Sequence, residues 1–361
     1  MYKGTGISKD QLSDDGEPCI LYGELYTKYK SETIREVISK TNIDNTKLVR
    51  SKANDVIIPC SGETAEDIAT ARCVLNGNIL LGGDLNIIRL YGYDGTFMSY
   101  QLNGKRKYDI AKVAQGVSVV HLYGEHLKGV KTINPCLTEQ KKIASLLTLL
   151  DERIAIQNKI IEDLKKLKCA IIEKVYSEIQ GKEYSYGQLF DVVNERNKQM
   201  EYSNILSASQ EKGMVNRDDL NLDIQFERSN INTYKIVKKG DYVIHLRSFQ
   251  GGFAFSDKLG VCSPAYTILR PNNLLEYGYL SNYFTSQRFI KSLIIVTYGI
   301  RDGRSINVDE WFSMKITIPS KEHQQYIVKV IGSFERKIEK EEAYATQLSI
   351  QKQYLLRQMF I

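Results

Sequence analysis

The 361-residue chain contains little proline, histidine or tryptophan: six, four and one residue respectively. No apolar run approaches the ~18 residues that a membrane-spanning helix requires. The N-terminal stretch Met1-Tyr-Lys-Gly-Thr-Gly lacks the apolar core of a secretory signal peptide. These absences argue against a membrane or secreted protein, and we expect a cytoplasmic location.

Motifs for metal binding and catalysis are also absent from the sequence. The six cysteines are scattered without a Cys-x-x-Cys motif, and no histidine joins a cysteine pair, which argues against a structural zinc site. There is no phosphate-binding Gly-x-x-x-x-Gly-Lys-Ser/Thr motif and no methyltransferase pair of Phe-x-Gly-x-Gly with Asn/Asp-Pro-Pro-Tyr/Phe. We therefore expect no catalytic residues, no metal and no cofactor in this chain.

The composition is otherwise that of a globular protein, with 42% hydrophobic and 25% charged residues. Its length allows two or three domains. The net charge of +6 fits a polyanionic partner, but a mild excess of this size favours nucleic acid only weakly.

An internal repeat is the most informative feature of the chain. Residues 135–177 recur at 319–361, with an offset of 184 residues and no gap. The identical pairs are Pro135/Pro319, Gln140/Gln324, Ile143/Ile327, Ile154/Ile338, Leu164/Leu348 and Lys168/Lys352. Apolar positions in both copies follow an alternating spacing of three and four residues, which is typical of a long amphipathic helix. The repeat predicts two similar halves, each a globular region followed by a long helix.

The repeat divides the chain into four segments: 1–134, 135–180, 181–318 and 319–361. In the two globular segments, short β-branched or aromatic runs are bounded by Gly, Pro or Asn, which predicts mixed α/β (α+β) domains. The two segments also resemble each other weakly, since Lys52-Ala-Asn-Asp-Val-Ile-Ile is similar to Lys238-Lys-Gly-Asp-Tyr-Val-Ile.

An amphipathic helix of about 40 residues cannot bury its apolar face alone, so each predicted helix needs the other. We expect an antiparallel coiled coil and partner-binding region that includes Gln140, Ile143, Leu150, Ile154, Ile161, Leu164, Gln324, Ile327, Phe334, Ile338, Leu348 and Leu355. Polar breaks in the apolar seam favour a register with Lys168 beside Glu341 and Gln157 beside Lys352. The alternative is that these polar residues are simply tolerated at the solvent edge.

The helix length predicts a spacing between two binding domains. From residue 143 to 175 a helix rises about 48 Å at 1.5 Å per residue. That rise spans about 14 base pairs of B-form DNA. Domains so separated could read two different half-sites on one face of a duplex.

Several motifs together carry a resemblance to a known family. They are the Pro-x-x-x-Glu-Gln-x-x-Ile-Ala stretch from Pro135 to Ala144 with Leu150, Asp151 and Ile154, Leu246-Arg-Ser-Phe-Gln-Gly-Gly, Cys262-Ser-Pro-Ala-Tyr-Thr-Ile-Leu, Tyr298-Gly-Ile-Arg-Asp-Gly-Arg-Ser-Ile-Asn, Tyr2-Lys-Gly-Thr-Gly-Ile-Ser-Lys and Tyr22-Gly-Glu-Leu-Tyr-Thr. Over essentially its whole length, the chain resembles the DNA-specificity (S) subunits of type I restriction–modification systems.

The resemblance implies target-recognition domains at 1–134 and 181–318 and conserved helical regions at 135–180 and 319–361. Such helices form an antiparallel coiled coil that docks two modification (methyltransferase) subunits, and restriction (translocase/endonuclease) subunits can join them. The S subunit itself is not catalytic; it directs adenine methylation or cleavage at a bipartite, asymmetric site in double-stranded DNA. S-adenosylmethionine, ATP and Mg²⁺ are then expected only in the partner subunits.

Two departures from the family pattern are visible. The second domain opens with Tyr186-Gly-Gln-Leu-Phe-Asp-Val-Val, whereas the first has no counterpart before Lys3, so we expect a shortened first domain. The Glu139-Gln140 pair of the first helix becomes His323-Gln324 in the second.

Side chains that read DNA are expected on Gly-containing loops, where the backbone can approach the duplex and Arg can bond guanine edges. The candidates are Lys3, Thr5, Tyr22, Ser61, Glu63, Thr64, Lys105 and Arg106 in the first domain, and Arg247, Ser248, Gln250, Tyr266, Arg301 and Arg304 in the second. As alternatives, Arg301 and Arg304 could belong to a structural turn around Asp302, Arg247 to an internal ion pair, and the basic run 105–107 to a solvated face. His121 and His126 are expected to be structural.

Two other functions fit parts of the sequence. One is a coiled-coil assembly scaffold without DNA reading. The other is a stand-alone DNA-modifying enzyme, for which Glu63, Glu66 and Asp67 could form an acidic group, although a helix N-terminus explains them better.

Overall fold

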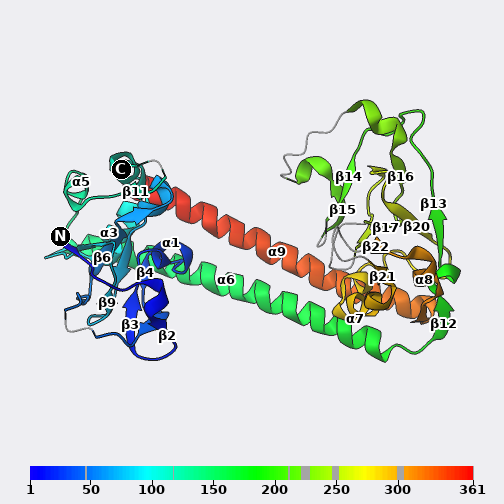
Figure 1. Ribbon diagram of the computed structural model, residues 1–361, viewed down its shortest axis with the longest axis horizontal. Helices are drawn as coiled ribbons and strands as arrows, with labels where there is room; N and C mark the ends of the chain where they lie inside the picture. The colour runs from blue at the N-terminus through cyan, green and yellow to red at the C-terminus, as the bar shows by residue number, and fades with distance from the viewer. Residues whose placement is uncertain are drawn as a thin grey trace. The chain divides into compact units, whose positions relative to one another are not determined.

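The computed structural model describes residues 1–44, 47–116, 118–209, 212–220, 228–245, 252–298 and 305–360. The chain divides into two compact units: unit 1 is Met1–Lys159 with Glu341–Ile361, and unit 2 is Ile160–Lys340. Each unit contains a mixed α/β region together with segments of two long helices (Figure 1). The predicted fold class, two mixed α/β regions with two long helices, is therefore confirmed.

Unit 1 contains two small sheets. The larger has the strand order β1 (Tyr2–Lys3), β10 (Leu85–Ile88), β6 (Asp55–Pro59), β8 (Arg72–Val74) and β4 (Thr33–Ile34), and the smaller has the order β2 (Leu12–Ser13), β5 (Ser39–Thr41), β3 (Glu17–Ile20) and β9 (Leu80–Leu81). All neighbours are antiparallel except β4 with β8 and β3 with β9. A separate pair joins β7 (Ser61–Gly62) to β11 (Val120–His121). Strand β6 is buried along its whole length, as its run of β-branched residues predicts.

Short helices connect these strands: η1 (Lys9–Gln11), α1 (Glu24–Thr27), α2 (Ala65–Ile68), α3 (Gly95–Asn103), α4 (Lys107–Val113) and α5 (Gly124–Lys128). Side-chain caps fix where the helices begin. Thr64 accepts a hydrogen bond from the Asp67 amide at the start of α2, and Asp94 accepts one from the Phe97 amide at the start of α3.

Unit 2 contains a sheet with the order β13 (Phe190–Val193), β20 (Thr267–Pro271), β17 (Tyr242–Ile244) and β18 (Phe253–Phe255), all antiparallel. Two-stranded pairs are formed by β12 (Lys182–Ser185) with β23 (Lys315–Ile318), β14 (Leu206–Ser209) with β15 (Gly213–Asn216), β16 (Lys235–Val237) with β19 (Gly260–Cys262), and β21 (Thr297–Tyr298) with β22 (Ser305–Ile306). The helices are η2 (Tyr186–Gln188), η3 (Arg217–Asp219), η4 (Arg228–Thr233), η5 (Tyr283–Thr285), α7 (Gln287–Ser292), η6 (Leu293–Val296) and α8 (Val308–Ser313).

The cores of the two α/β regions differ in chemistry. In unit 1 the sheet packs mainly through aliphatic side chains such as Ile57, Val74 and Leu85. In unit 2 the core is aromatic: Trp311 stacks on Tyr186 at 4.3 Å between ring centroids, and Phe284 lies among the same rings. Large aromatic side chains bury more area per residue, so a few of them can hold this region together.

Two long helices, α6 (Leu137–Glu178) and α9 (Lys321–Met359), follow the α/β regions in sequence. Pro135 and Pro319 precede them, and neither helix contains an internal proline. Gly181 follows α6 where a side chain would not fit, since a Cβ atom there would lie 2.2 Å from the Ile318 carbonyl oxygen. Within the described residues, no helix combines the length and apolarity needed to cross a bilayer.

Candidate functional site

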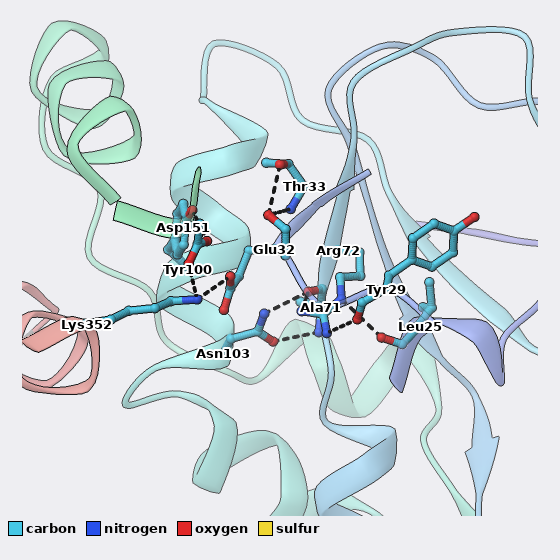
Figure 2. A network of polar contacts seen from close by, with 11 residues as sticks. Leu25, Tyr29, Glu32, Thr33, Ala71, Arg72, Tyr100, Asn103, Asp151 and Lys352 are labelled. Atoms are coloured by element: carbon cyan, nitrogen blue, oxygen red, sulfur yellow. Dashed lines mark hydrogen bonds and ion pairs between the residues drawn. The ribbon is translucent and has the colours of Figure 1, made fainter. Parts of the chain in front are cut away.

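In unit 1, a buried ionic cluster joins both long helices to the α/β region (Figure 2). The Lys352 ammonium on α9 lies 2.6 Å from Asp151 on α6 and 2.8 Å from Glu32, which precedes β4. Tyr100 on α3 donates its hydroxyl to Asp151 Oδ2 at 2.6 Å. The Lys352 side chain is only 16% exposed. The cluster therefore connects four elements through one cation.

Electrostatics stabilise the charged form of this cation. Burial opposes the charge on Lys352, but Glu32 and Asp151 outweigh it and raise the pKa of the ammonium. Burial also raises the pKa of the Tyr100 hydroxyl, and Asp151 adds to this effect. Because these polar groups bond to one another, the cluster is suited to holding the elements together rather than to transferring protons.

A second buried cation extends this network into the α/β region. The Arg72 guanidinium on β8 donates to the carbonyl oxygens of Leu25 at 3.1 Å and Tyr29 at 3.0 Å (Figure 2). These carbonyls lie in and just beyond α1, so Arg72 fixes the end of that short helix.

Unit 2 contains the counterpart of the Lys352–Asp151 pair. Lys168 on α6 lies 2.7 Å from Glu335 on α9. Adding the repeat offset of 184 residues converts Lys168 to Lys352 and Asp151 to Glu335. The two ion pairs are therefore the same contact, made once in each half of the repeat. The unit 2 copy is more solvated, with side chains 22% and 41% exposed.

The predicted register of the two helices is wrong. Lys168 contacts Glu335 rather than Glu341, and Lys352 contacts Asp151 rather than Gln157. Gln157 instead donates its side-chain amide to Glu341, within unit 1. The prediction failed because it paired only residues of the apolar seam. Asp151 and Glu335 lie one residue beyond the seam positions Leu150 and Phe334, and flanking carboxylates can reach across to a seam lysine.

Antiparallel packing of the helix segments in unit 1 follows from two contacts between them. In unit 1, going forward on α6 from Asp151 to Gln157 corresponds to going back on α9 from Lys352 to Glu341. Of the predicted seam residues, the structure buries Ile161, Ile327, Ile338 and Leu348 and half-buries Ile143, Leu150, Ile154, Leu164, Phe334 and Leu355.

Gln140 and Gln324 attach each long helix to its α/β region. The Gln140 side chain accepts from the Asp94 amide at 2.9 Å and donates to the Pro135 carbonyl at 2.7 Å. Gln324 accepts from the Glu276 amide at 2.7 Å and donates to the carbonyls of Leu274 and Pro319. Both glutamines are 1% exposed. Their side chains therefore attach each helix to its α/β region from inside the fold, and neither side chain is exposed to a partner.

The α/β regions share a turn and an ion pair as well. Asp55 and Asp241 each follow a turn residue with positive φ, Asn54 at 76° and Gly240 at 95°. Asp55 then forms a two-point ion pair with Arg89, at 3.0 and 2.8 Å. Asp241 does the same with Arg270, at 2.9 and 3.0 Å. The weak sequence similarity around Asp55 and Asp241 thus reflects a common scaffold.

A cluster in unit 1 includes two of the predicted DNA contacts, Lys3 and Ser61. Lys3 on β1 lies 6.0 Å from the ring of Tyr123, and Ser61 on β7 is paired in register with His121 on β11. His121 in turn stacks on Tyr123 with 6.3 Å between ring centroids, and the His126 ring is perpendicular to the Tyr123 ring with 5.6 Å between centroids. We call Lys3, Ser61, His121, Tyr123 and His126 the Lys3 cluster. Ser61 itself is buried, and its hydroxyl donates to Asp84 Oδ2 at 3.0 Å. The exposed members Lys3, His121 and Tyr123 combine a cation with aromatic rings, a mixture suited to phosphates and bases.

The sequence pattern did not single out Tyr123, and His121 was expected to be structural. Tyr123 is 46% exposed and His121 is exposed. Neither lies in a basic run or beside a glycine pair, so only the pairing of β7 with β11 reveals that they flank Ser61.

The other predicted contacts in unit 1 have mixed surroundings. Glu63 and Lys105 are exposed, and Tyr22 packs partly against the core. Thr64 caps α2, the Thr5 hydroxyl accepts from the Val49 amide at 3.3 Å, and Arg106 pairs with Asp109 at 3.4 Å. Thr64, Thr5 and Arg106 thus each have a partner within the fold.

In unit 2, most predicted contacts lie outside the described residues: Arg247, Ser248, Gln250, Arg301 and Arg304. Tyr266 is described and is half-buried, with its carbonyl accepting from Lys235 Nζ at 2.7 Å and its ring 6.2 Å from His245. Burial lowers the pKa of both Lys235 and His245. Arg196 forms an isolated antiparallel β-bridge with Lys235, and its side chain is exposed. The described part of the chain holds no group of three or more His, Cys, Asp or Glu placed for a metal ion.

Comparison with known proteins identifies relatives of this fold. Residues 181–348 match a family described as type I restriction modification DNA specificity domain. The fold is similar to the S subunit of a type I restriction-modification system from M. genitalium, with a TM-score of 0.55 and 16% identity, covering 100% of this chain and 93% of that one. It is also similar to a chain from a structure on assembly and conformational transition of the type I R-M system, with a TM-score of 0.57 and 15% identity, covering 89% and 86%. The comparison with curated proteins gives no significant match.

Proposed function

Since the chain belongs, through residues 181–348, to the DNA-specificity family of type I restriction–modification systems, we propose that it selects the DNA sequence on which such a complex acts. The match to a specificity domain carries this proposal. The repeated geometry adds that the first half, which lies outside the match, is built on the same plan.

Each α/β region reads one half of a bipartite DNA site. The scaffold is shared, because both regions carry the same turn and the same Asp–Arg ion pair. The described surfaces differ in their side chains. Unit 1 presents the Lys3 cluster, whereas unit 2 presents Arg196, Lys235 and Tyr266. Like scaffolds with unlike surfaces favour two half-sites of different sequence.

The long helices dock the modification subunits of the complex. In unit 1, α6 exposes Leu146, Leu149 and Ile156, with exposed fractions of 49%, 61% and 62%. Their spacing of three and seven residues places them on one helix face. On α9, Ile350 and Tyr354 are 61% and 62% exposed and lie four residues apart. Exposed apolar side chains aligned on a helix are typical of a protein interface.

In this proposal the catalytic chemistry belongs to partner subunits. The modification subunits bind S-adenosylmethionine, and the restriction subunits bind ATP and Mg²⁺. This chain contributes the DNA sequence preference and the surface on which the partners assemble, as a non-catalytic subunit.

Methylome sequencing of the host, with and without this chain, tests the proposal. Loss of a bipartite adenine-methylation motif on deletion, and its return on complementation, is the expected result. An unchanged methylome in a host whose modification subunits are active would favour a scaffold without DNA reading. Methylation of DNA by the purified chain with S-adenosylmethionine alone would favour a stand-alone enzyme.

A further inference from the structure

Met200 in unit 2 has an unusual backbone conformation. In the described part of the chain, the non-glycine residues with positive φ are Asn54, Asn78, Asp84 and Met200. Asn and Asp tolerate this left-handed region because their short polar side chains can form local hydrogen bonds. Methionine has no such group, so the φ of 53° at Met200 costs free energy that glycine would not cost. Strained residues of this kind are concentrated at functional sites.

A buried asparagine holds the loop that carries Met200. Asn197 is 2% exposed, and its side chain donates to the Tyr202 carbonyl at 2.7 Å and accepts from the Tyr202 amide at 3.2 Å. The Asn197 amide donates to the Tyr234 carbonyl, and the Asn197 carbonyl accepts from the Met200 amide, both at 2.9 Å. One buried residue therefore closes the loop around Met200 and fixes it to the rest of unit 2.

Core packing does not explain the methionine. Its side chain is 56% exposed, and the preceding residues Lys198 and Gln199 are exposed as well. Met200 belongs to neither of the apolar clusters that form the core of unit 2 in the described residues. The fold thus keeps an apolar side chain in solvent at a position that glycine or asparagine would occupy with less strain.

Cations lie beside this side chain in the sequence. Arg196 and Lys198 are exposed, and the Arg196 backbone is bridged to Lys235. Glu201 is the single carboxylate within residues 196–204. Exposed arginine and lysine side chains are the usual contacts to DNA phosphates, which position a protein on the duplex without reading its sequence. The loop therefore combines phosphate-binding groups with one apolar side chain.

The chemistry of methionine limits what it can read on DNA. Its side chain has no hydrogen-bond donor, and its sulfur is a weak acceptor. Among the base edges in the major groove, the 5-methyl group of thymine is the apolar feature. An unbranched thioether adapts its shape to an apolar neighbour. Met200 is therefore better suited to a thymine methyl group than to the polar base edges.

We propose that Met200 is a specificity-determining residue of unit 2 and contacts the 5-methyl group of a thymine in the half-site that this unit reads. Arg196 and Lys198 contact phosphates beside that thymine. The fixed loop reduces the conformational entropy lost on binding. This role rests on the proposed function, to which it adds one residue and one base.

Methylome sequencing of a host that carries Met200→Gly is the first test. Relaxation at one T·A base pair is expected, in the half-site that Tyr123→Ala leaves unchanged. Because glycine adopts positive φ freely, the midpoint of thermal unfolding should not fall. Lost discrimination without lost stability separates a DNA contact from a structural role.

A duplex with deoxyuridine in place of that thymidine lacks only the methyl group. The natural chain, assembled with its modification subunits, should bind this duplex about fourfold more weakly than the thymine duplex, the usual effect of one apolar methyl group. Met200→Gly and Met200→Asn should bind both duplexes equally. Met200→Leu keeps an apolar side chain and should still distinguish them. Fluorescence anisotropy of the labelled duplexes measures these affinities.

Asn78→Gly is the matched control, since Asn78 is exposed in unit 1 and has a φ of 67°. This variant should keep the recognised sequence and the fourfold effect of the methyl group. An unchanged methylome in Met200→Gly, or relaxation at a G·C pair, would overturn the proposal. Loss of affinity in Met200→Gly without any effect of deoxyuridine on the natural chain would overturn it too, and would favour insertion of Met200 between base pairs. Absence of any sequence-dependent DNA binding by the natural complex would instead overturn the proposed function, and this role with it.

Discussion

At the scale of single residues, the repeat preserves buried side chains that attach each long helix to its α/β region, rather than exposed side chains. Gln140 and Gln324 are identical in sequence and play the same structural role, since each holds the turn of the α/β region against the start of a long helix. Their identity could be seen in the sequence, but their burial could not, because a glutamine at a helix start usually faces solvent. The carbonyl and amide groups that they satisfy belong to loops, whose positions the sequence pattern does not reveal.

Replacing Gln324 by leucine should destabilise unit 2. The change leaves the Glu276 amide and the carbonyls of Leu274 and Pro319 without this partner in a buried position, so we expect a loss of about 2 kcal/mol in the free energy of unfolding. Thermal or denaturant unfolding measures the loss.

The neighbouring Gln325→Leu is the matched control. Gln325 is exposed, so its replacement should change the free energy of unfolding by no more than about 0.5 kcal/mol. Equal effects of the two substitutions would mean that the Gln324 hydrogen bonds do not stabilise unit 2.

At the scale of elements, the long helices and their chemistry were largely predictable, and their register was not. The three-and-four spacing and the absence of proline predicted both helices. Their antiparallel direction was expected from the resemblance to S subunits, and contacts within unit 1 confirm it. The register depends on Lys352 reaching Asp151 and Glu32. Glu32 comes from an α/β loop far away in sequence, so no pattern within the helices could include it.

Lys352→Met and Lys168→Met form a matched pair of substitutions. Lys352→Met leaves Asp151 and Glu32 buried without their cation and should cost about 3 kcal/mol of stability. Lys168→Met removes a partly solvated pair and should cost about 0.5 kcal/mol. Chemical denaturation of both variants checks this, and a reversed order would contradict the burial assigned to the two clusters.

The same cluster predicts a dependence on alkaline pH. The pKa of Lys352 is raised in the folded chain, so its stabilising contribution is complete below the ordinary lysine pKa and is lost as pH rises through the raised value. The stability difference between the natural chain and Lys352→Met should therefore shrink only at strongly alkaline pH. A difference that vanished near neutral pH would show that Lys352 is not paired as described.

The exposed apolar face of α6 gives a test of partner docking. Leu149→Asp with Ile156→Asp should abolish co-purification of the modification subunit, because each aspartate would be buried at the interface without a partner. Asn158→Asp, an exposed position on the opposite side of α6, is the control and should leave co-purification intact. Retention of the partner by the double variant would place docking elsewhere.

At the scale of the whole molecule, the sequence predicted two α/β regions on a common plan, and the structure gives that plan a physical form. The two Asp–Arg ion pairs and their positive-φ turns are scaffold, visible in the sequence only as a faint similarity. The surfaces built on this scaffold could not be predicted, because Tyr123 and His121 join Lys3 only through pairing of two-residue strands. Such short strands give almost no periodic signal.

Because each α/β region is proposed to read its own half-site, a change in the Lys3 cluster should alter only one half of the recognised sequence. Tyr123→Ala is expected to weaken discrimination at one or two base pairs by about 1–3 kcal/mol and to leave the other half unchanged. Methylome sequencing of the complemented host shows which bases are relaxed.

The exposed Tyr91→Ala, outside the Lys3 cluster, is the control and should leave the recognised sequence as it was. Relaxation of both halves by Tyr123→Ala would contradict separate reading.

The contact between Gln157 and Glu341 has a consequence for the pairing of halves. These two residues occupy the same repeat position, so each copy of the helix meets the other copy at its own counterpart. If two second halves from different molecules paired in this way, two glutamates would face each other and repel. An unlike pair removes that repulsion, so this one position favours closure of a chain on itself over the association of two second halves.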